Sequence, residues 1–173
     1  MINNTGGPPG GPILNASESD FLQALGRHLL ASHLLVQKLV PGMEAAGYGR
    51  IINVVSTSIR EPIPNLGVSN TTRGAVASWA KSLARELPSG ITINNVMPGF
   101  TDTERLDGLR GAIAARTGKS LDDVQAGWMA QVPEGRLVQP EETAAAIAFL
   151  ASPAAAAIRG VSLAVDGGRM RSI

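Results

Sequence analysis

Cysteine is absent from the 173-residue sequence, which excludes disulfide bonds and metal sites built on thiolates. Histidine is also scarce, because only His28 and His33 occur. No carboxylates stand at a spacing that would complete a zinc site with either histidine. The sequence therefore predicts no metal site.

Aromatic residues are few, at 3% of the chain, whereas hydrophobic residues make up 44%. The core must therefore be built mainly from Ala, Val, Leu and Ile. A length of 173 residues suits one domain or a large part of one.

A strong charge of either sign is missing as well. The formal net charge is +1 and the Lys and Arg residues are scattered, which argues against nucleic acid as the main partner. The N-terminus shows no basic region followed by an apolar run, so no signal peptide is predicted. The longest apolar run, Ala144 to Ile158, is interrupted by Ser152 and Pro153 and is too short to cross a bilayer. We expect a cytoplasmic protein that binds neither membranes nor nucleic acids.

Short β-branched runs alternate with helical patterns along the chain. The runs predict buried strands over Arg50–Ser56, Ile91–Met97 and Val161–Gly168. The apolar spacing predicts helices over Glu18–Met43, Asn70–Leu87 and Pro140–Ala151. Strands that alternate with helices of this length indicate an α/β fold with a parallel sheet covered on both faces.

Three local features refine this pattern. The first helix is expected to be capped by Ser19 or Asp20, and the second by Ser69 or Asn70. The segment Thr101–Gly135 is polar, contains glycine and is expected to hold two short helices as a lid after a strand's carboxyl end. The "GGPPGG" run predicts a rigid turn rather than a phosphate loop, because its prolines have no N–H to offer an anion.

Four motifs follow one another along the chain: "INNTGG", "GRIINVVS", "NNVMPGFTDT", and a C-terminal motif made of "RLVQPEETAAAIAFLAS" followed by "GVSLAVDGG". Together they resemble the short-chain dehydrogenase/reductase family over nearly the whole chain. The resemblance implies a Rossmann-like doubly wound parallel sheet. Against the family pattern, the chain begins inside the fourth strand, so the first three β-α units are expected to be missing and strands 4–7 to be retained. Residues 1–173 would then be a single partial domain, with 101–135 as its lid.

The resemblance implies hydride transfer between NAD or NADP and a small carbonyl or alcohol substrate. In the family a tyrosine handles the proton, a lysine four residues later holds the nicotinamide ribose, and a serine thirteen residues before the tyrosine binds the substrate oxygen. Ser56 matches that serine, but the counts then reach Ser69 and Arg73. Tyr48, the only tyrosine, is expected in a surface turn, so the family's usual proton donor is missing.

The family's relay asparagine falls at His28. One interpretation makes His28 part of the proton relay or a substitute acid–base group, since histidine titrates near neutrality. The other makes it an inert, hydrogen-bonded residue on a helix flank, as we expect for His33. The resemblance implies cofactor contacts from a wider set: Asn4, Gly6, Arg73, Pro98, Gly99, Thr101 and Thr103.

Two functional readings follow from the missing residues. The first is an oxidoreductase impaired in this chain, which we expect to bind NAD(P) weakly or not at all because it lacks the family's glycine-rich phosphate turn. The second is a non-catalytic subunit or a ligand-binding pseudoenzyme. The resemblance also implies a homo-oligomer formed through the helices at 18–43 and 70–87.

Overall fold

The computed structural model describes residues 1–172. Its centre is a parallel sheet of four strands in the order β1-β2-β3-β4. The strands are β1 (Ile2–Asn3), β2 (Gly49–Val54), β3 (Ile91–Pro98) and β4 (Ser162–Val165). The parallel α/β sheet predicted from the alternating pattern is therefore confirmed, with each long strand ending within three residues of its predicted boundary.

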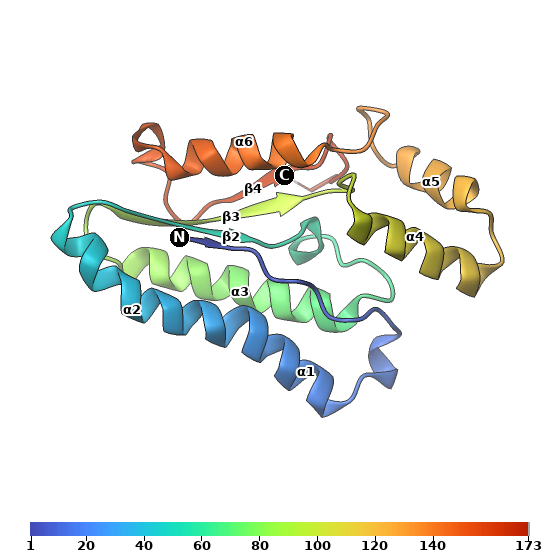
Figure 1. Ribbon diagram of the computed structural model, residues 1–173, viewed down its shortest axis with the longest axis horizontal. Helices are drawn as coiled ribbons and strands as arrows, with labels where there is room; N and C mark the ends of the chain where they lie inside the picture. The colour runs from blue at the N-terminus through green and yellow to red at the C-terminus, as the bar shows by residue number, and fades with distance from the viewer. Residues whose placement is uncertain (173) are drawn as a thin grey trace.

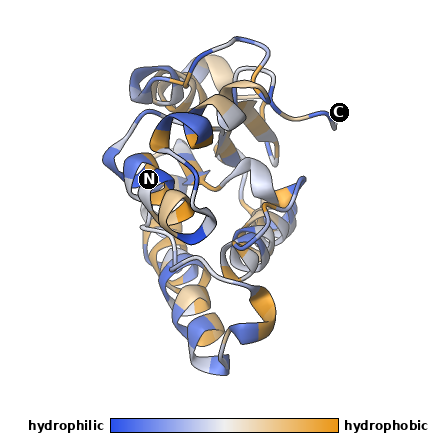
Figure 2. Cartoon of the chain, turned by 90° about the vertical axis from the view of Figure 1, so that its right-hand side faces the viewer, coloured by the Kyte–Doolittle hydropathy of each residue, from blue (hydrophilic) through white to orange (hydrophobic). Residues whose placement is uncertain are grey.

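Helices cover both faces of this sheet (Figure 1). One face packs against α2 (Ala31–Ala45) and α3 (Gly67–Glu86), with α1 (Glu18–Leu25) packed on α3, and the other face packs against α6 (Pro140–Ala151). Successive β2 residues point to opposite faces of the sheet. Ile51 packs with side chains of α2 and α3, whereas Ile52 packs with Leu150 of α6. Hydrophobic and hydrophilic residues share the same helices (Figure 2), as amphipathic helices on a sheet require.

The first helical region is not continuous. A π-helical turn, η2 (Gly26–Leu30), separates α1 from α2 inside the predicted span Glu18–Met43. Helix α1 is capped by Ser17, whose side chain accepts from the backbone N–H of Asp20 while the Asp20 carboxylate accepts from the N–H of Ser17. The prediction of Ser19 or Asp20 as the cap was wrong. Ser17 is the cap, and Asp20 is its reciprocal partner in this capping box.

The start of α3 also differs from the prediction. The helix begins at Gly67, three residues before the expected Asn70, and Leu66 at its N-cap offers no side-chain hydrogen bond. Ser69 and Asn70 lie inside the first turns, so neither caps the helix. Asn70 instead donates its side-chain amide to the Ile63 carbonyl at 2.9 Å and ties the preceding loop to the helix.

The segment 101–135 contains the two expected helices, α4 (Glu104–Thr117) and α5 (Leu121–Met129). Short 3-10 turns complete the chain at η1 (Ile13–Asn15), η3 (Thr57–Ile59) and η4 (Pro153–Ala155). In residues 1–172, no helix combines the length and the apolar character needed to cross a membrane. The same residues contain no group of three or more potential metal ligands.

A chain of side-chain hydrogen bonds crosses the whole sheet at one level. Asn3 donates to Asn53 at 2.7 Å, Asn53 donates to Asn95 at 2.9 Å, and Asn95 donates to the Ser162 hydroxyl at 3.0 Å. These residues are register partners on four successive strands. Asn53 and Asn95 are almost fully buried, so each amide depends on its neighbours for hydrogen bonding.

Asn53→Ala should test this ladder. The change removes the oxygen that accepts from Asn3 and the amide that donates to Asn95. The side-chain nitrogen of Asn3 and the side-chain oxygen of Asn95 would then lack these partners inside the sheet. We expect the free energy of unfolding to fall by about 2 kcal/mol or more, measured by urea denaturation followed by circular dichroism. Asn15→Ala, at an exposed position, should change it by no more than about 0.5 kcal/mol. Equal stability of the two variants would show that the ladder contributes little.

Candidate active site

The carboxyl ends of the strands gather the predicted site residues at one edge of the sheet (Figure 1), as a parallel sheet must. Ser56 follows β2, Gly99 follows β3, and Asn4 follows β1. Tyr48 lies at the opposite end, just before β2, where its hydroxyl donates to the Ala151 carbonyl. Tyr48 therefore lies away from the strand ends that carry Ser56, Gly99 and Asn4.

Arg73 connects α3 to the end of β2. Its Nη1 donates to the carbonyls of Val54 at 3.1 Å and Val55 at 2.8 Å, immediately before Ser56. Its Nε donates to the Ser69 hydroxyl one helical turn earlier, at 3.3 Å. Burial, followed by the nearby Arg105 guanidinium, lowers the pKa of Arg73. The structure thus brings Ser69 and Arg73 to the strand end that carries Ser56.

Ser56 uses its hydroxyl as an acceptor. The oxygen takes a hydrogen bond from the backbone N–H of Ser58 at 3.1 Å and so begins the η3 turn. A hydroxyl that accepts from the backbone keeps its own proton to donate. Ser56 can therefore donate to an oxygen placed beside the end of β2.

His28 lies on the π-helical turn and is only 5% exposed. Its Nδ1 shares a hydrogen bond with the Thr5 hydroxyl. Burial lowers the pKa of His28, and the charges of Arg73 and Arg27 lower it further, against a smaller opposite effect from the Gly6 backbone. The neutral imidazole is therefore favoured. Among the described residues, no hydrogen bond joins His28 to Ser56, Ser69 or Arg73.

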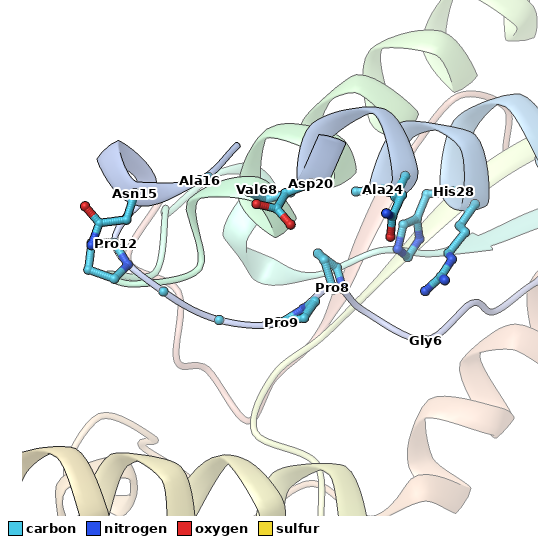
Figure 3. Close-up of a pocket in the computed structure, with 14 residues that line it drawn as sticks. Gly6, Pro8, Pro9, Pro12, Asn15, Ala16, Asp20, Ala24, His28 and Val68 are labelled. Atoms are coloured by element: carbon cyan, nitrogen blue, oxygen red, sulfur yellow. The ribbon is translucent and has the colours of Figure 1, made fainter. Parts of the chain in front are cut away.

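Two cavities adjoin His28. A small one, of about 10 Å³, lies between His28, Arg73 and the Asn3–Asn53 end of the amide ladder, at the lower limit for one water molecule. A larger one, of about 290 Å³, lies between α1 and the segment Gly6–Pro12 (Figure 3). His28 lines both cavities, and so lies between the small buried cavity beside Arg73 and the larger cavity beside α1.

The Gly6–Gly11 segment does not form the predicted rigid turn. It runs as an extended coil along the larger cavity and pairs with the α3 entrance through a bridge between Gly11 and Leu66. The Gly11 N–H donates to the Asn65 carbonyl at 2.7 Å. Proline keeps this coil extended while the glycines allow close approach to its neighbours.

The remaining predicted cofactor residues have local structural partners. A Cβ on Gly99 would lie 2.7 Å from both Cα and Cβ of Asp166, so packing alone demands glycine there. Thr101 donates to the Gly99 carbonyl at 3.3 Å, and Thr103 caps α4. Asn4 is exposed. These contacts leave a cofactor role for these residues, and for Gly6 and Pro98, as a prediction.

Sequence reasoning missed two residues of the site. Thr5 stands where the family pattern has alanine, and this difference was the available signal for its bond with His28. Arg105 lies in the first turn of α4, and its side chain reaches back to the Pro8 carbonyl at 3.3 Å. Nothing in the local sequence pattern indicated that contact.

The lowered pKa of His28 predicts a pH dependence of stability. The unfolded chain takes up a proton near pH 6.5, whereas the folded chain does so only at lower pH. Stability should therefore rise as the pH increases from the folded pKa up to about 6.5 and level off above it. Urea denaturation at a series of pH values should show this rise in the wild type and in His33→Gln, but a smaller one in His28→Gln. An unchanged slope in His28→Gln would contradict the assignment.

Comparisons with known proteins agree with this geometry. The family described as Enoyl-(Acyl carrier protein) reductase matches residues 1–169. The 3-oxoacyl-[acyl-carrier-protein] reductase FabG of Vibrio cholerae is 35% identical over 171 residues, which are 97% of this chain and 65% of the relative. The cis-4-hydroxycyclohexanecarboxylate dehydrogenase of Sinomonas cyclohexanicum is 42% identical over 134 residues, 73% of this chain and 47% of that enzyme.

A solved structure gives the same result for the fold. The F189W actinorhodin polyketide ketoreductase, crystallised with NADPH, aligns with a TM-score of 0.91 and 30% identity, covering 99% of this chain and 67% of that one. The chain thus spans about 65% of the length of the FabG relative. The ordered motifs, the parallel sheet and these matches establish that the chain belongs to the short-chain dehydrogenase/reductase family.

Proposed function

We propose that this chain provides the substrate side of an oxidoreductase that transfers a hydride between NAD(P) and a small carbonyl or alcohol. One observation carries the proposal: Arg73 is fixed on the carbonyls of Val54 and Val55 at the end of β2, directly before Ser56. The family places its ribose-holding lysine and substrate-binding serine in this relation. The names of the relatives, which are reductases and dehydrogenases, support the same reaction class.

The residues present fit the nicotinamide end of such a cofactor. A Cβ on Gly6 would have no neighbouring heavy atom within 4 Å, so a ligand can approach the backbone there. Arg73 leaves its Nη2 without a hydrogen bond among the described residues, facing the same segment. When bound, the nicotinamide would supply or accept the hydride. Arg73 would hold the ribose hydroxyls, because guanidinium is a forked donor.

The remaining predicted residues would line the same ligand. We assign Asn4 and Gly6 to the nicotinamide ribose, Pro98 and Gly99 to the turn beneath the ring, and Thr101 and Thr103 to the carboxamide or phosphates. NAD and NADP stay open as alternatives.

The proton must follow a route without tyrosine. Ser69, at the tyrosine position, is a far weaker acid than a phenol, whose pKa is about 10. In our proposal Ser56 donates a hydrogen bond to the substrate oxygen. For alcohol oxidation, neutral His28 would accept the hydroxyl proton, directly or through a water in the small cavity that it shares with Arg73, as the hydride leaves the carbon. For carbonyl reduction, the imidazolium would return that proton to the oxygen. Ser69 acts by accepting from Arg73 and so fixes the guanidinium.

The segment 101–135 would act as a lid on a single domain over residues 1–173. Trp128 of α5 stacks on Phe100 with ring centroids 5.2 Å apart. The guanidinium carbon of Arg169 lies 4.6 Å from the centroid of the same Phe100 ring. These contacts fix α5 to the end of β3 and to the C-terminal turn. Trp128 therefore packs within the protein rather than forming part of an apolar substrate pocket.

A non-catalytic subunit is the second candidate. The absence of a tyrosine at position 69 favours it, and so does an exposed apolar surface on α1, η2 and α2. Five leucines on these elements, each 42–60% exposed, form this leucine surface: Leu22, Leu30, Leu34, Leu35 and Leu39. We propose a homo-oligomer through the helices at 18–43 and 70–87. The cytoplasmic location expected from the sequence stays a prediction.

The catalytic proposal predicts a defect in Ser56→Ala. Assays should use millimolar NADH or NADPH, because we expect this chain to bind either nucleotide weakly, and a panel of small ketones and aldehydes. Loss of the hydrogen bond to the reacting oxygen should lower kcat/KM by about 100-fold. Ser82→Ala, exposed on α3, should match the wild type. Absence of turnover on the whole panel, together with copurification of an intact dehydrogenase, would favour the non-catalytic subunit.

The oligomer proposal predicts that Leu34→Glu disrupts assembly. A carboxylate in the middle of an apolar interface would be buried without a partner. Light scattering after size exclusion should show a multimer for the wild type and a smaller species for Leu34→Glu. Leu14→Glu changes a leucine that is 96% exposed in the 3-10 turn η1 before α1 and should leave the mass unchanged. A monomeric wild type would contradict the proposal.

A further inference from the structure

Two arginines from different helices converge on one point of the site. Nη2 of Arg73 and Nη2 of Arg105 lie 3.4 Å and 3.5 Å from the place that a Cβ on Gly7 would occupy. Arg73 comes from α3 and Arg105 from the first turn of α4. The Pro8 carbonyl accepts from Arg105 at 3.3 Å and holds its guanidinium over the segment.

No carboxylate neutralises this pair within residues 1–172. The ion pairs of the described chain involve Arg110 and Arg136. Arg73 bonds only with two backbone carbonyls and Ser69, and Arg105 only with Pro8. Two cations that face one point, one of them partly buried, repel each other unless an anion lies between them.

The other charged groups nearby do not supply that anion. Arg27 adds positive charge, and burial favours neutral His28. Asp20 lines the larger cavity on the α1 side, where Ser17 occupies its carboxylate in the capping box. Both guanidinium groups thus lack a carboxylate partner within residues 1–172.

Gly7 keeps the shared point open. Its φ angle lies outside the left-handed region, so the backbone does not require glycine there. A methyl group at this position would instead touch both guanidinium groups and fill the space between them. A side chain at this position would occupy the place that both guanidinium groups face.

We propose that Arg73 and Arg105 bind an anionic group, a carboxylate or a phosphate, over Gly7. Guanidinium groups present paired N–H donors that match both of these groups. The anion would join α3 to α4 and so order the first turn of the lid segment. If this site and the proposed function are both correct, the cofactor or substrate of that function carries a negatively charged group. The inference rests on the proposed function only for the identity of the ligand's reacting group.

The test measures anion binding directly, without turnover. Inorganic phosphate is titrated into the ¹⁵N-labelled chain at constant ionic strength, and the amide signals of Gly6 and Gly7 are followed by NMR. The wild type should show saturable shifts. Arg105→Gln should weaken binding at least about tenfold, since hydrogen bonds to charged groups contribute about 1.5–3 kcal/mol. Arg116→Gln, an equal charge change at an exposed position of the same helix, should bind like the wild type.

A second pair of variants changes no charge. Gly7→Ala should weaken phosphate binding by filling the shared point, whereas Gly11→Ala, whose Cβ would meet nothing within 4 Å, should not. Equal weakening by Arg105→Gln and Arg116→Gln would reduce the effect to general charge attraction and overturn the site. Saturable binding that survives both Arg105→Gln and Gly7→Ala, or no saturable binding at all, would overturn it as well.

Competition experiments then identify the source of the anion. Displacement of phosphate by nicotinamide mononucleotide would place a cofactor phosphate in the site, and displacement by cyclohexanecarboxylate would place a substrate carboxylate there. Either result supports the site, and failure of both compounds contradicts it. An inactive chain that still binds anions through Arg105 would remove the proposed function and keep the site, whereas an active chain without such binding would do the reverse.

Discussion

The buried amide ladder is the constraint on which the arrangement of the site depends. An asparagine in the middle of a covered sheet is tolerated only when its amide is fully paired. Asn53 meets this requirement through its partners on both sides. A slip of one residue in any strand would turn that strand's amide to the other face and break the chain of bonds. The ladder therefore fixes the relative heights of the strands, and with them the positions at which Asn4, Ser56 and Gly99 leave the sheet.

Arg73 builds on this fixed edge. The carbonyls that it binds belong to Val54, the last residue of β2, and to Val55, which follows it. Nη1 engages both carbonyls and Nε engages Ser69, so Nη2 has no hydrogen bond within residues 1–172. Arg73 thus joins α3 to the end of β2 and still keeps one guanidinium nitrogen for a ligand.

The sequence predicted the layers of the fold better than the details of the site. The strands and α6 follow from apolar periodicity, and Pro140 with two following glutamates marked the start of α6 correctly. The start of α3 was missed because tertiary packing, and no capping side chain, begins the helix at Gly67. The π-helical turn at His28 has no signature in the pattern of leucines, since a single added residue hardly changes the spacing.

The contacts within the site were harder to predict for a different reason. The position of Arg73 followed from counting along a family motif, which works because the motif is local. Arg105 and Thr5 contact residues far away in the chain, Pro8 and His28. Periodicity and spacing contain no information about such partners. Only the folded chain shows that the Gly6–Gly11 segment contacts both Arg105 of α4 and the residues just before α3.

The pairing of Thr5 with His28 makes the effect of replacing either residue depend on the other. Loss of the threonine hydroxyl alone would leave a ring nitrogen of the buried His28 without its present partner. Loss of the imidazole alone would leave the Thr5 hydroxyl at an exposed position, where water can bond with it. The two single replacements therefore differ in what they leave unpaired, and a stepwise redesign of this pair should replace His28 before Thr5.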